Sequence, residues 1–253
     1  MYNDWFTIGN FTIHGYGFMI ALGILVGFWI AERQAKKNGL NPSEVDNIVY
    51  VALISGWLFS KITYTIINWK DFIQDPIHFL LTGSGWVVIG GILGGAFGAY
   101  LYCRYKKLNF MEYANLIFPE VALAQAFGRI GCFFAGCCYG KHTTSPFGIV
   151  FPANGYTEAG ARLIPTQLLS AFGDFVLFIV LFNLYNDKKT RKYVIAAYMI
   201  LYSIGRFLIE FLRGDRERGF IGMLSTSQFL CIFTLLGGLI LMFQARKKEV
   251  SIL

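Results

Sequence analysis

The sequence has 253 residues, of which 55% are hydrophobic, 17% aromatic and only 15% charged. This composition, with its positive mean hydropathy, indicates a polytopic membrane protein rather than a soluble domain. A formal net charge of +7 could suggest a nucleic-acid partner, but the basic residues form short clusters between apolar stretches and no basic domain. Basic loops beside a membrane explain the charge more simply, so we expect no nucleic-acid partner.

Seven apolar stretches follow one another along the chain, and each approaches the roughly 20 residues that a helix needs to cross a bilayer. We therefore predict an all-α, polytopic membrane protein with about seven transmembrane helices, at about residues 16–31, 47–67, 86–103, 114–134, 167–185, 194–212 and 221–244. Charged residues interrupt the second, fourth and sixth stretches. A spanning helix tolerates such charges only where they face the bundle interior or water. The first functional candidates are therefore the four interrupting residues, Lys61, Arg129, Arg206 and Glu210.

The lysines and arginines between the stretches are distributed unevenly. Thirteen of them follow stretches one, three, five and seven, and six lie in the other connections. Because cytoplasmic loops carry the excess of basic residues, we expect the N-terminus outside and the C-terminus in the cytoplasm. No internal repeat or low-complexity tract is visible. We predict one integral membrane domain over residues 1–253, with outer-side segments at about 69–85 and 141–165.

Tyr202, Arg206, Glu210 and Arg213 recur in the sixth stretch at spacings of four, four and three residues, which places them on one helical face. Such a face could be purely structural, with each charge paired to the next. It could also capture an anion, because the planar fork of arginine binds phosphate oxygens bidentately and Glu210 would hold one fork in position. Arg129 in the fourth stretch would complete a two-arginine clamp. Since the sequence has no Walker-type phosphate loop, the clamp favours a phospholipid headgroup over a nucleotide.

A cysteine-rich and glycine-rich turn follows Arg129 directly and contains Cys132, Cys137 and Cys138. Three interpretations are open for this turn. It could be tightly packed, with a disulfide or inert thiols; it could carry a nucleophilic or acyl-carrying thiol activated by Arg129; or it could bind zinc. The spacing is not that of the usual zinc-binding cysteine pairs, so we expect no metal and no other cofactor.

Taken together, these residues resemble the prolipoprotein diacylglyceryl transferase family, from about His14 to Phe229. The resemblance is carried by Tyr16-Gly17, Lys61-Ile62-Thr63-Tyr64 (Arg-Leu-x-Tyr in the family), Gly90-Gly91, Gly128-Arg129-Ile130-Gly131, Pro146, Pro152, Pro165-Thr166-Gln167-Leu168, Tyr202, Arg206-Phe207, Glu210-Phe211, Arg213, Gly222, Ser225 and Gln228. It implies a seven-helix, multi-pass enzyme of the bacterial cytoplasmic (inner) membrane. The family moves the diacylglyceryl group of phosphatidylglycerol to the thiol of a lipobox cysteine and releases glycerol 1-phosphate.

The sequence departs from the family pattern mainly where the family handles protons. The departures are Ile89 and Ile164 in place of histidines, Cys132 in place of an asparagine, Cys137 in place of an acid, and Leu169-Ser170 in place of Tyr-Glu. Activating a thiol whose pKa is about 8.5 needs a base or a strong local positive field. We expect the replacement among Glu210, His142 and the three cysteines of the turn.

The charge argument and the resemblance together indicate the site residues. The predicted catalytic residues are Arg129, Arg206 and Glu210. The predicted substrate-binding residues are Tyr16, Lys61, Tyr202, Arg213, Gln228, Cys132, Cys137 and Cys138. We expect phosphatidylglycerol or a similar anionic phospholipid as donor, and a prolipoprotein as the acceptor. The alternatives are another outer-leaflet acceptor, such as a glycan or lipid hydroxyl, and a non-catalytic phospholipid-binding or transport protein.

Overall fold

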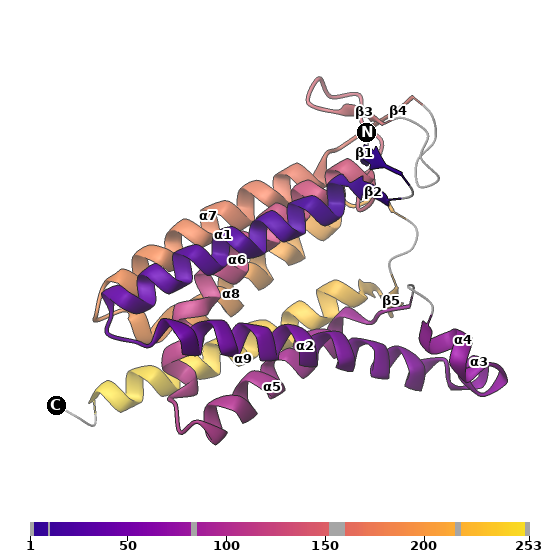
Figure 1. Ribbon diagram of the computed structural model, residues 1–253. Helices are drawn as coiled ribbons and strands as arrows, with labels where there is room; N and C mark the ends of the chain where they lie inside the picture. Colours follow the sequence, from indigo (N-terminus) through magenta and orange to yellow (C-terminus); the bar gives the residue numbers. More distant parts are fainter. Residues whose placement is uncertain (1–2, 10, 82–84, 152–159, 216–218, 251–253) are drawn as a thin grey trace. The chain divides into compact units, whose positions relative to one another are not determined.

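The computed structural model describes residues 3–9, 11–81, 85–151, 160–215 and 219–250 (Figure 1). Long helices dominate these residues, and each of the seven predicted stretches overlaps one of them. In chain order they are α1 (Gly15–Lys37), α2 (Pro42–Ile67), α5 (Val88–Tyr105), α6 (Phe110–Ala135), α7 (Thr166–Asn186), α8 (Val194–Ile209) and α9 (Thr226–Val250). The prediction of an all-α architecture is confirmed.

Among the helices of the described residues, six are long and apolar enough to cross a membrane, which confirms a polytopic membrane protein. The exception among the seven long helices is α5, whose 18 residues include five glycines and Arg104. Glycine contributes almost nothing to the mean hydropathy of the helix, and arginine lowers it. The mean hydropathy of α5 is therefore low, although the helix is long enough to cross a membrane. The seventh span therefore stays a prediction.

The chain divides into two compact units, and the prediction of a single membrane domain across both stays a prediction. We call them the middle unit (Glu32–Tyr113) and the discontinuous unit (Met1–Ala31 and Ala114–Leu253). In the middle unit α2 packs against α5 through small residues. A Cβ atom added to Gly56 would lie 2.9 Å from the carbonyl oxygen of Gly91, and one added to Gly95 would lie 2.9 Å from that of Ala52. Glycine at these positions therefore lets the two backbones approach closely.

Substituting Gly95 with valine tests this packing. Because a Cβ atom there would meet backbone rather than a flexible side chain, α5 must move away from α2. We expect the free energy of unfolding to fall by about 1–3 kcal/mol, the usual cost of overpacking. The measurement is the thermal unfolding midpoint of the detergent-purified protein. Gly173→Val is the matched control, since nothing lies within 4 Å of a Cβ atom at Gly173. Equal midpoints for the two variants would contradict close packing of α2 and α5.

The predicted outer segment at 69–85 contains two short helices, α3 (Trp69–Gln74) and α4 (Pro76–Leu81), followed by residues 82–84, which lie outside the described residues. From the sequence we expect a connection here without helices, because Asp75-Pro76 is a turn signal. The structure places Pro76 at the first position of α4, where a missing N–H costs nothing. The aromatic ring of Phe79 on α4 stacks on that of Tyr64, with 5.2 Å between centroids.

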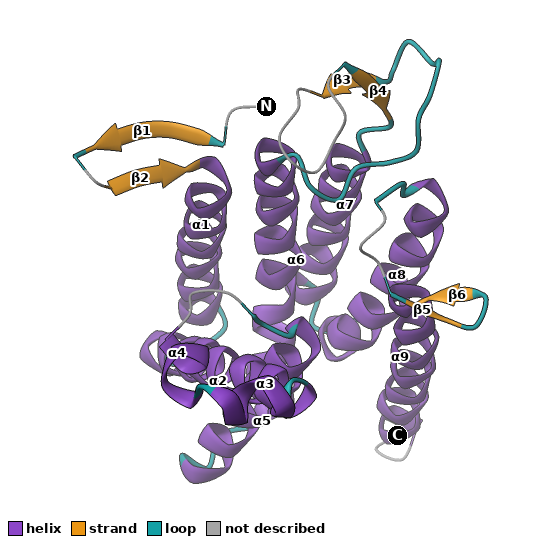
Figure 2. Cartoon of the chain, turned by 90° about the vertical axis from the view of Figure 1, so that its right-hand side faces the viewer, coloured by secondary structure: helices purple, strands orange, loops and turns teal. Residues whose placement is uncertain are grey.

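The discontinuous unit contains α1, α6, α7, α8 and α9 together with three small antiparallel hairpins (Figure 2). The hairpins are β1 (Asp4–Ile8) with β2 (Phe11–His14), β3 (Ile149–Phe151) with β4 (Ala161–Leu163), and β5 (Phe220–Ile221) with β6 (Leu224–Ser225). The first two lie at the end of the unit where α1 and α7 begin and α6 ends (Figures 1 and 2), which we call the hairpin end. The predicted structured segment at 141–165 is thus built around β3 and β4, with residues 152–159 outside the described part.

Close approach also holds the helices of this unit together. A Cβ atom at Gly23 on α1 would lie 2.8 Å from Cβ of Phe127 on α6, and one at Gly238 on α9 would lie 3.2 Å from the carbonyl oxygen of Ala196 on α8. The ring of Tyr198 on α8 stacks on that of Tyr202, one turn further along the helix. These contacts fix the faces that α6 and α8 turn toward the interior of the unit.

Candidate functional site

A cavity of about 250 Å³ lies between α6, α7 and α8, within the discontinuous unit. Its polar lining consists of Arg129 from α6, Ser170 and Asp174 from α7, and Tyr202 and Arg206 from α8. The lining farther from the hairpin end is apolar and consists of Val176, Leu177, Val180 and Leu201. Several of these apolar side chains are more than a third exposed, so the cavity opens on the outer surface of α7 and α8. It therefore joins a charged compartment to an apolar one.

Arg129 supplies a cation to this cavity from the last turns of α6. In the part of the chain that the structure describes, Arg129 takes part in no salt bridge and no hydrogen bond, although its charge interacts with those of Asp174 and nearby groups. A guanidinium group inside a membrane protein needs an anion or water to receive its five N–H donors. The cavity is where such an anion would bind.

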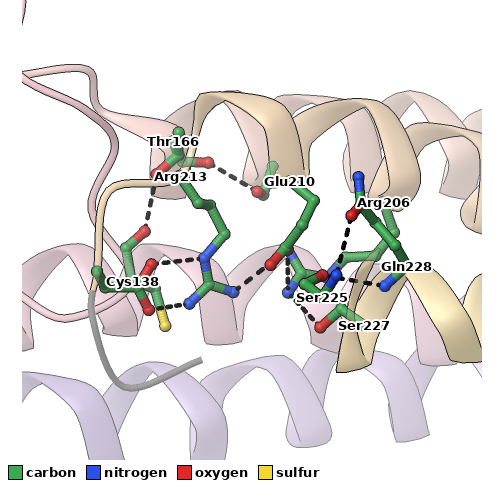
Figure 3. Close-up of polar contacts among 10 residues, drawn as sticks. Cys138, Thr166, Arg206, Glu210, Arg213, Ser225, Ser227 and Gln228 are labelled. Carbon is green, nitrogen blue, oxygen red and sulfur yellow. Dashed lines mark hydrogen bonds and ion pairs between the residues drawn. The ribbon is translucent and has the colours of Figure 1, made fainter. Parts of the chain in front are cut away.

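Arg206 is held differently, by groups behind the cavity wall (Figure 3). Its Nη2 lies 2.9 Å from Oε2 of Glu210 and donates to Oγ of Ser227 at 3.0 Å. Oε2 of Glu210 also lies 3.8 Å from Nη1 of Arg213, and the Glu210 side chain is only 1% exposed. The buried carboxylate of Glu210 therefore lies between two arginines and contacts Arg206 more closely. The prediction that Arg129 and Arg206 come together is also met, since both line the cavity.

The end of α8 differs from the single helical face expected from the sequence. Glu210–Leu212 form a 3-10 turn, and Arg213 follows it with an extended backbone. Tightening of the last turn into a 3-10 helix is common at helix C-termini. Arg213 is bound by Asp215, through Nε to Oδ1 at 2.8 Å and through Nη2 to Oδ2, so its main partner is not Glu210. Asp215 was not among the predicted site residues.

The three cysteines after Arg129 converge in space. Their Sγ atoms all lie within 4.8 Å of one another, and each residue is partly exposed. The structure shows all three as free thiols, so the disulfide interpretation is not met in it. Hydrogen bonds from Cys132 and Cys137, together with the charges of Arg213 and Arg129, lower the pKa of the Cys138 thiol. Hydrogen bonds to Cys132 and Cys138 raise the pKa of the Cys137 thiol, so neighbouring thiols of the turn shift in opposite directions.

Comparison with known proteins bears directly on this geometry. Residues 3–244 match the model of the prolipoprotein diacylglyceryl transferase family. The chain belongs to this family. It is 47% identical over 235 residues to phosphatidylglycerol–prolipoprotein diacylglyceryl transferase 2 of Clostridium perfringens, with 92% of this chain and 91% of the relative covered. It is 43% identical to the corresponding transferase of Clostridium tetani over 236 residues (92% and 94% covered) and 35% identical to that of Clostridioides difficile over 245 residues (96% and 95%).

Membership of the prolipoprotein diacylglyceryl transferase family confirms the resemblance seen in the sequence, while the individual site residues stay predictions. Tyr16 lies in the first turn of α1, and a Cβ atom at Gly131 would come within 3.1 Å of its carbonyl oxygen, so it borders the cysteine turn. Gln228 forms a reciprocal pair with Ser225 at the start of α9: each backbone N–H donates to the other side chain, at 3.1 and 3.2 Å. This capping box accounts for Gln228 structurally.

Lys61, the remaining predicted residue of this transferase site, belongs to the middle unit. Its side chain is buried, and Nζ lies 5.1 Å from the ring centroid of Trp86, 5.5 Å from that of Phe79 and 5.6 Å from that of Tyr64. Three aromatic faces around an ammonium group stabilise its charge. The structure thus explains how the middle unit tolerates Lys61, and its role toward a lipid stays a prediction.

The sequence analysis missed two acidic residues of this family member. Asp174 on α7 is 7% exposed and lines the cavity, where its charge interacts with those of Arg129 and Arg206. Glu120 on α6 is 5% exposed, and neither of its carboxylate oxygens has a hydrogen-bond partner within the described residues. The signal for both was an isolated acid inside an otherwise apolar stretch, the same signal that singled out Arg129.

Proposed function

We propose that this protein transfers the diacylglyceryl group of phosphatidylglycerol to the lipobox cysteine thiol of a prolipoprotein. The transferases at 43–47% identity carry both substrates in their names and are covered almost end to end. The observation that carries the proposal for this chain is Arg129, a cation in an intramembrane cavity that has no salt-bridge partner among the described residues. A phosphodiester supplies the anion that such a site needs.

The cavity suits a phospholipid because its two compartments match the two parts of the molecule. The arginines would bind the phosphate at the polar end, while the diacylglyceryl part would lie along Val176, Val180 and Leu201. A cavity of about 250 Å³ holds a headgroup rather than a whole lipid. The acyl chains would remain outside the cavity, where the exposed apolar side chains of α7 and α8 meet the membrane.

In the proposed reaction the acceptor thiol attacks the glyceryl carbon and the phosphate leaves as glycerol 1-phosphate. Negative charge accumulates on the phosphate as the carbon–oxygen bond breaks. Arg129 and Arg206 would stabilise that charge, and they are positioned before the reaction begins, which is the usual source of electrostatic catalysis. Glu210 keeps Arg206 in place from outside the cavity. Asp174 also lines the cavity, and its charge interacts with those of both arginines.

The proposed setting is the bacterial cytoplasmic membrane, with the hairpin end of the discontinuous unit outside. Four basic residues follow α7 at the opposite end, namely Lys188, Lys189, Arg191 and Lys192. The excess of positive charge on the cytoplasmic side supports this orientation. The polar end of the cavity would then face the outer leaflet, where a translocated prolipoprotein presents its cysteine.

The test combines a direct assay with a substitution that fills the cavity. Purified protein in nanodiscs is incubated with labelled phosphatidylglycerol and a lipobox peptide, and peptide mass and glycerol phosphate are followed. In Gly205→Leu the new side chain enters the cavity, because nothing lies within 4 Å of a Cβ atom there. We expect the wild type to form both products, and this variant to lose at least about tenfold in kcat/KM with an unchanged unfolding midpoint.

Gly205→Ala serves as the size control and should retain most of the activity. Full activity of Gly205→Leu would mean that the lipid does not use this cavity. Glycerol phosphate without modified peptide would point to a different acceptor. Lipid binding without either product would leave a non-catalytic phospholipid-binding protein and would overturn the proposed transfer.

A further inference from the structure

The convergence of Cys132, Cys137 and Cys138 is the feature that the lipid-binding cavity does not explain. Their three Sγ atoms lie within 4.8 Å of one another. Three thiolates on one tetrahedral zinc ion, with Zn–S bonds of about 2.3 Å, are about 3.8 Å apart. A contraction of about 1 Å at most would bring the three sulfur atoms to that geometry, which is within the reach of side-chain rotation.

The backbone of the turn is held in the conformation that makes the thiols converge. Gly136 has φ of 72° and Cys138 has φ of 60°, a left-handed conformation that is uncommon for a residue with a side chain. The carbonyl oxygen of Cys137 accepts from Nε2 of Gln167 at 2.7 Å. That of Cys138 accepts from Oγ1 of Thr166, also at 2.7 Å (Figure 3). Both donors are 1% exposed. A strained conformation persists only where its surroundings hold it, so the cluster is preorganised.

Among the described residues, the cluster provides three protein ligands and no fourth. Within the described residues, the group of possible ligands contains these cysteines alone. His142, which the sequence suggested as an alternative base, is exposed and its backbone pairs with that of Leu163 instead. Structural zinc sites have four protein ligands, whereas catalytic sites have three and keep one position for water or substrate. Three thiolates and Zn²⁺ carry a net charge of −1, which the neighbouring Arg129 and Arg213 would balance.

We propose that Cys132, Cys137 and Cys138 bind a thiophilic d¹⁰ cation, represented by Zn²⁺, and that its fourth position takes the acceptor thiol of the substrate protein. The inference rests on the proposed diacylglyceryl transfer and deepens it. A thiol that coordinates a metal is deprotonated. The metal would thus provide the nucleophilic thiolate without a general base.

The reaction balances with no further reactant. The acceptor R–SH releases its proton to water when its sulfur binds Zn²⁺. A sulfur electron pair then forms the bond to the glyceryl carbon of the lipid, the bond from that carbon to the phosphate oxygen breaks, and the electron pair stays on that oxygen. The products are the diacylglyceryl thioether and glycerol 1-phosphate. The negative charge that the phosphate gains balances the positive charge of the released proton.

The position of the cluster fits this role. Cys132 follows Arg129 by three residues on α6, which is a rise of about 4.5 Å along the helix. A sulfur atom bound next to Cys132 would therefore lie beside the polar end of the cavity, where the phosphate leaves. Tyr16 and Gly131, which border the turn, would form the adjacent wall.

The first experiment tests metal binding on the unaltered chain. Reduced protein in detergent is alkylated with and without Zn²⁺, and modified cysteines are identified by mass spectrometry. We expect Zn²⁺ to protect the three cysteines of the turn and to leave the labelling of Cys103 and Cys231, which are buried in α5 and α9, unchanged. Cys132→Ala, Cys137→Ala and Cys138→Ala should each weaken Zn²⁺ binding by more than about 100-fold, while Cys103→Ala should not. Equal labelling with and without Zn²⁺, or a disulfide within the turn in intact membranes, would overturn the site.

The second experiment tests the fourth position with Co²⁺ in place of Zn²⁺. A lipobox peptide should shift the visible Co²⁺ spectrum, and the same peptide with serine for cysteine should not. Identical spectra with both peptides would overturn acceptor binding. Undiminished peptide transfer by metal-free protein would also overturn it while leaving the proposed function intact. If no transfer occurs with any metal, the proposed function fails, and the Co²⁺ spectrum still decides whether the cluster binds a thiol.

Discussion

Replacing Arg129 with alanine should lower kcat for diacylglyceryl transfer by about 100- to 1,000-fold, the typical cost of removing one group that stabilises developing charge. The expectation follows from the partners of the two cavity arginines. Arg206 already shares its charge with Glu210, at 2.9 Å. Arg129 interacts with the charge of Asp174 but forms no salt bridge within the described residues, so more of its charge than that of Arg206 is available to the phosphate. The measurement is initial rates over a range of phosphatidylglycerol concentrations, which separates kcat from KM.

The control variants separate three effects: loss of the positive charge at residue 129, loss of the planar guanidinium shape, and a non-specific effect of removing an arginine. Arg129→Lys keeps the charge but loses the planar fork, so we expect an activity between those of the alanine variant and the wild type. Arg104→Ala removes an exposed arginine from the last turn of α5 and should leave kcat unchanged. If Arg129→Ala changed KM alone, the arginine would bind lipid without stabilising the leaving phosphate. Full activity would remove Arg129 from the mechanism.

The helices and the two cavity arginines could be predicted from the sequence, because both predictions follow from the free-energy cost of placing polar or charged groups in a membrane. Seven apolar stretches predicted seven long helices, and an arginine inside such a stretch predicted a lined cavity. The same rule, applied to α7, would have found Asp174. Asp174 is the single charged residue of that helix and was not among the predicted site residues.

The cysteine cluster was less predictable because its geometry comes from the backbone and from distant donors. Sequence spacing left zinc as one of three interpretations for Cys132, Cys137 and Cys138 and favoured none of the usual zinc motifs. The left-handed conformations of Gly136 and Cys138 turn the chain back on itself, and Thr166 and Gln167, nearly 30 residues later, fix the turn. Spacing rules describe only local loops, so they contain no information about donors supplied by another helix.

The short hairpins were also missed, for a different physical reason. The strands of β3 and β4 have three residues each, and those of β5 and β6 have two. Such segments are too short to show the alternation of apolar and polar residues that identifies a strand. They are instead defined by pairing with a partner strand, such as Ile149 of β3 opposite Leu163 of β4.

Substituting Glu210 with glutamine should lower the free energy of unfolding by about 3–5 kcal/mol, the range found when one partner of a buried ion pair is removed. The Glu210 side chain is 1% exposed and faces Arg206 and Arg213, which are 12% and 10% exposed. Glutamine has nearly the same shape, so the variant changes charge without creating a cavity. Arg213 would keep Asp215, whereas Arg206 would keep only Ser227 among the partners that the structure describes. The measurement is chemical or thermal unfolding of the purified protein in detergent.

The double variant Arg206→Gln/Glu210→Gln distinguishes a lost ion pair from a general packing defect. Because it removes both charges of the Arg206–Glu210 pair, neither member is left buried without the other, and the double variant should be more stable than Glu210→Gln alone. Asp215→Asn affects only Arg213 and should cost less than Glu210→Gln. All three variants should lose some transferase activity, so activity does not distinguish them. The order of their free energies of unfolding does. The single variant Arg206→Gln completes the cycle. A double variant whose loss equals the sum of the losses of Arg206→Gln and Glu210→Gln would show that Glu210 does not position Arg206.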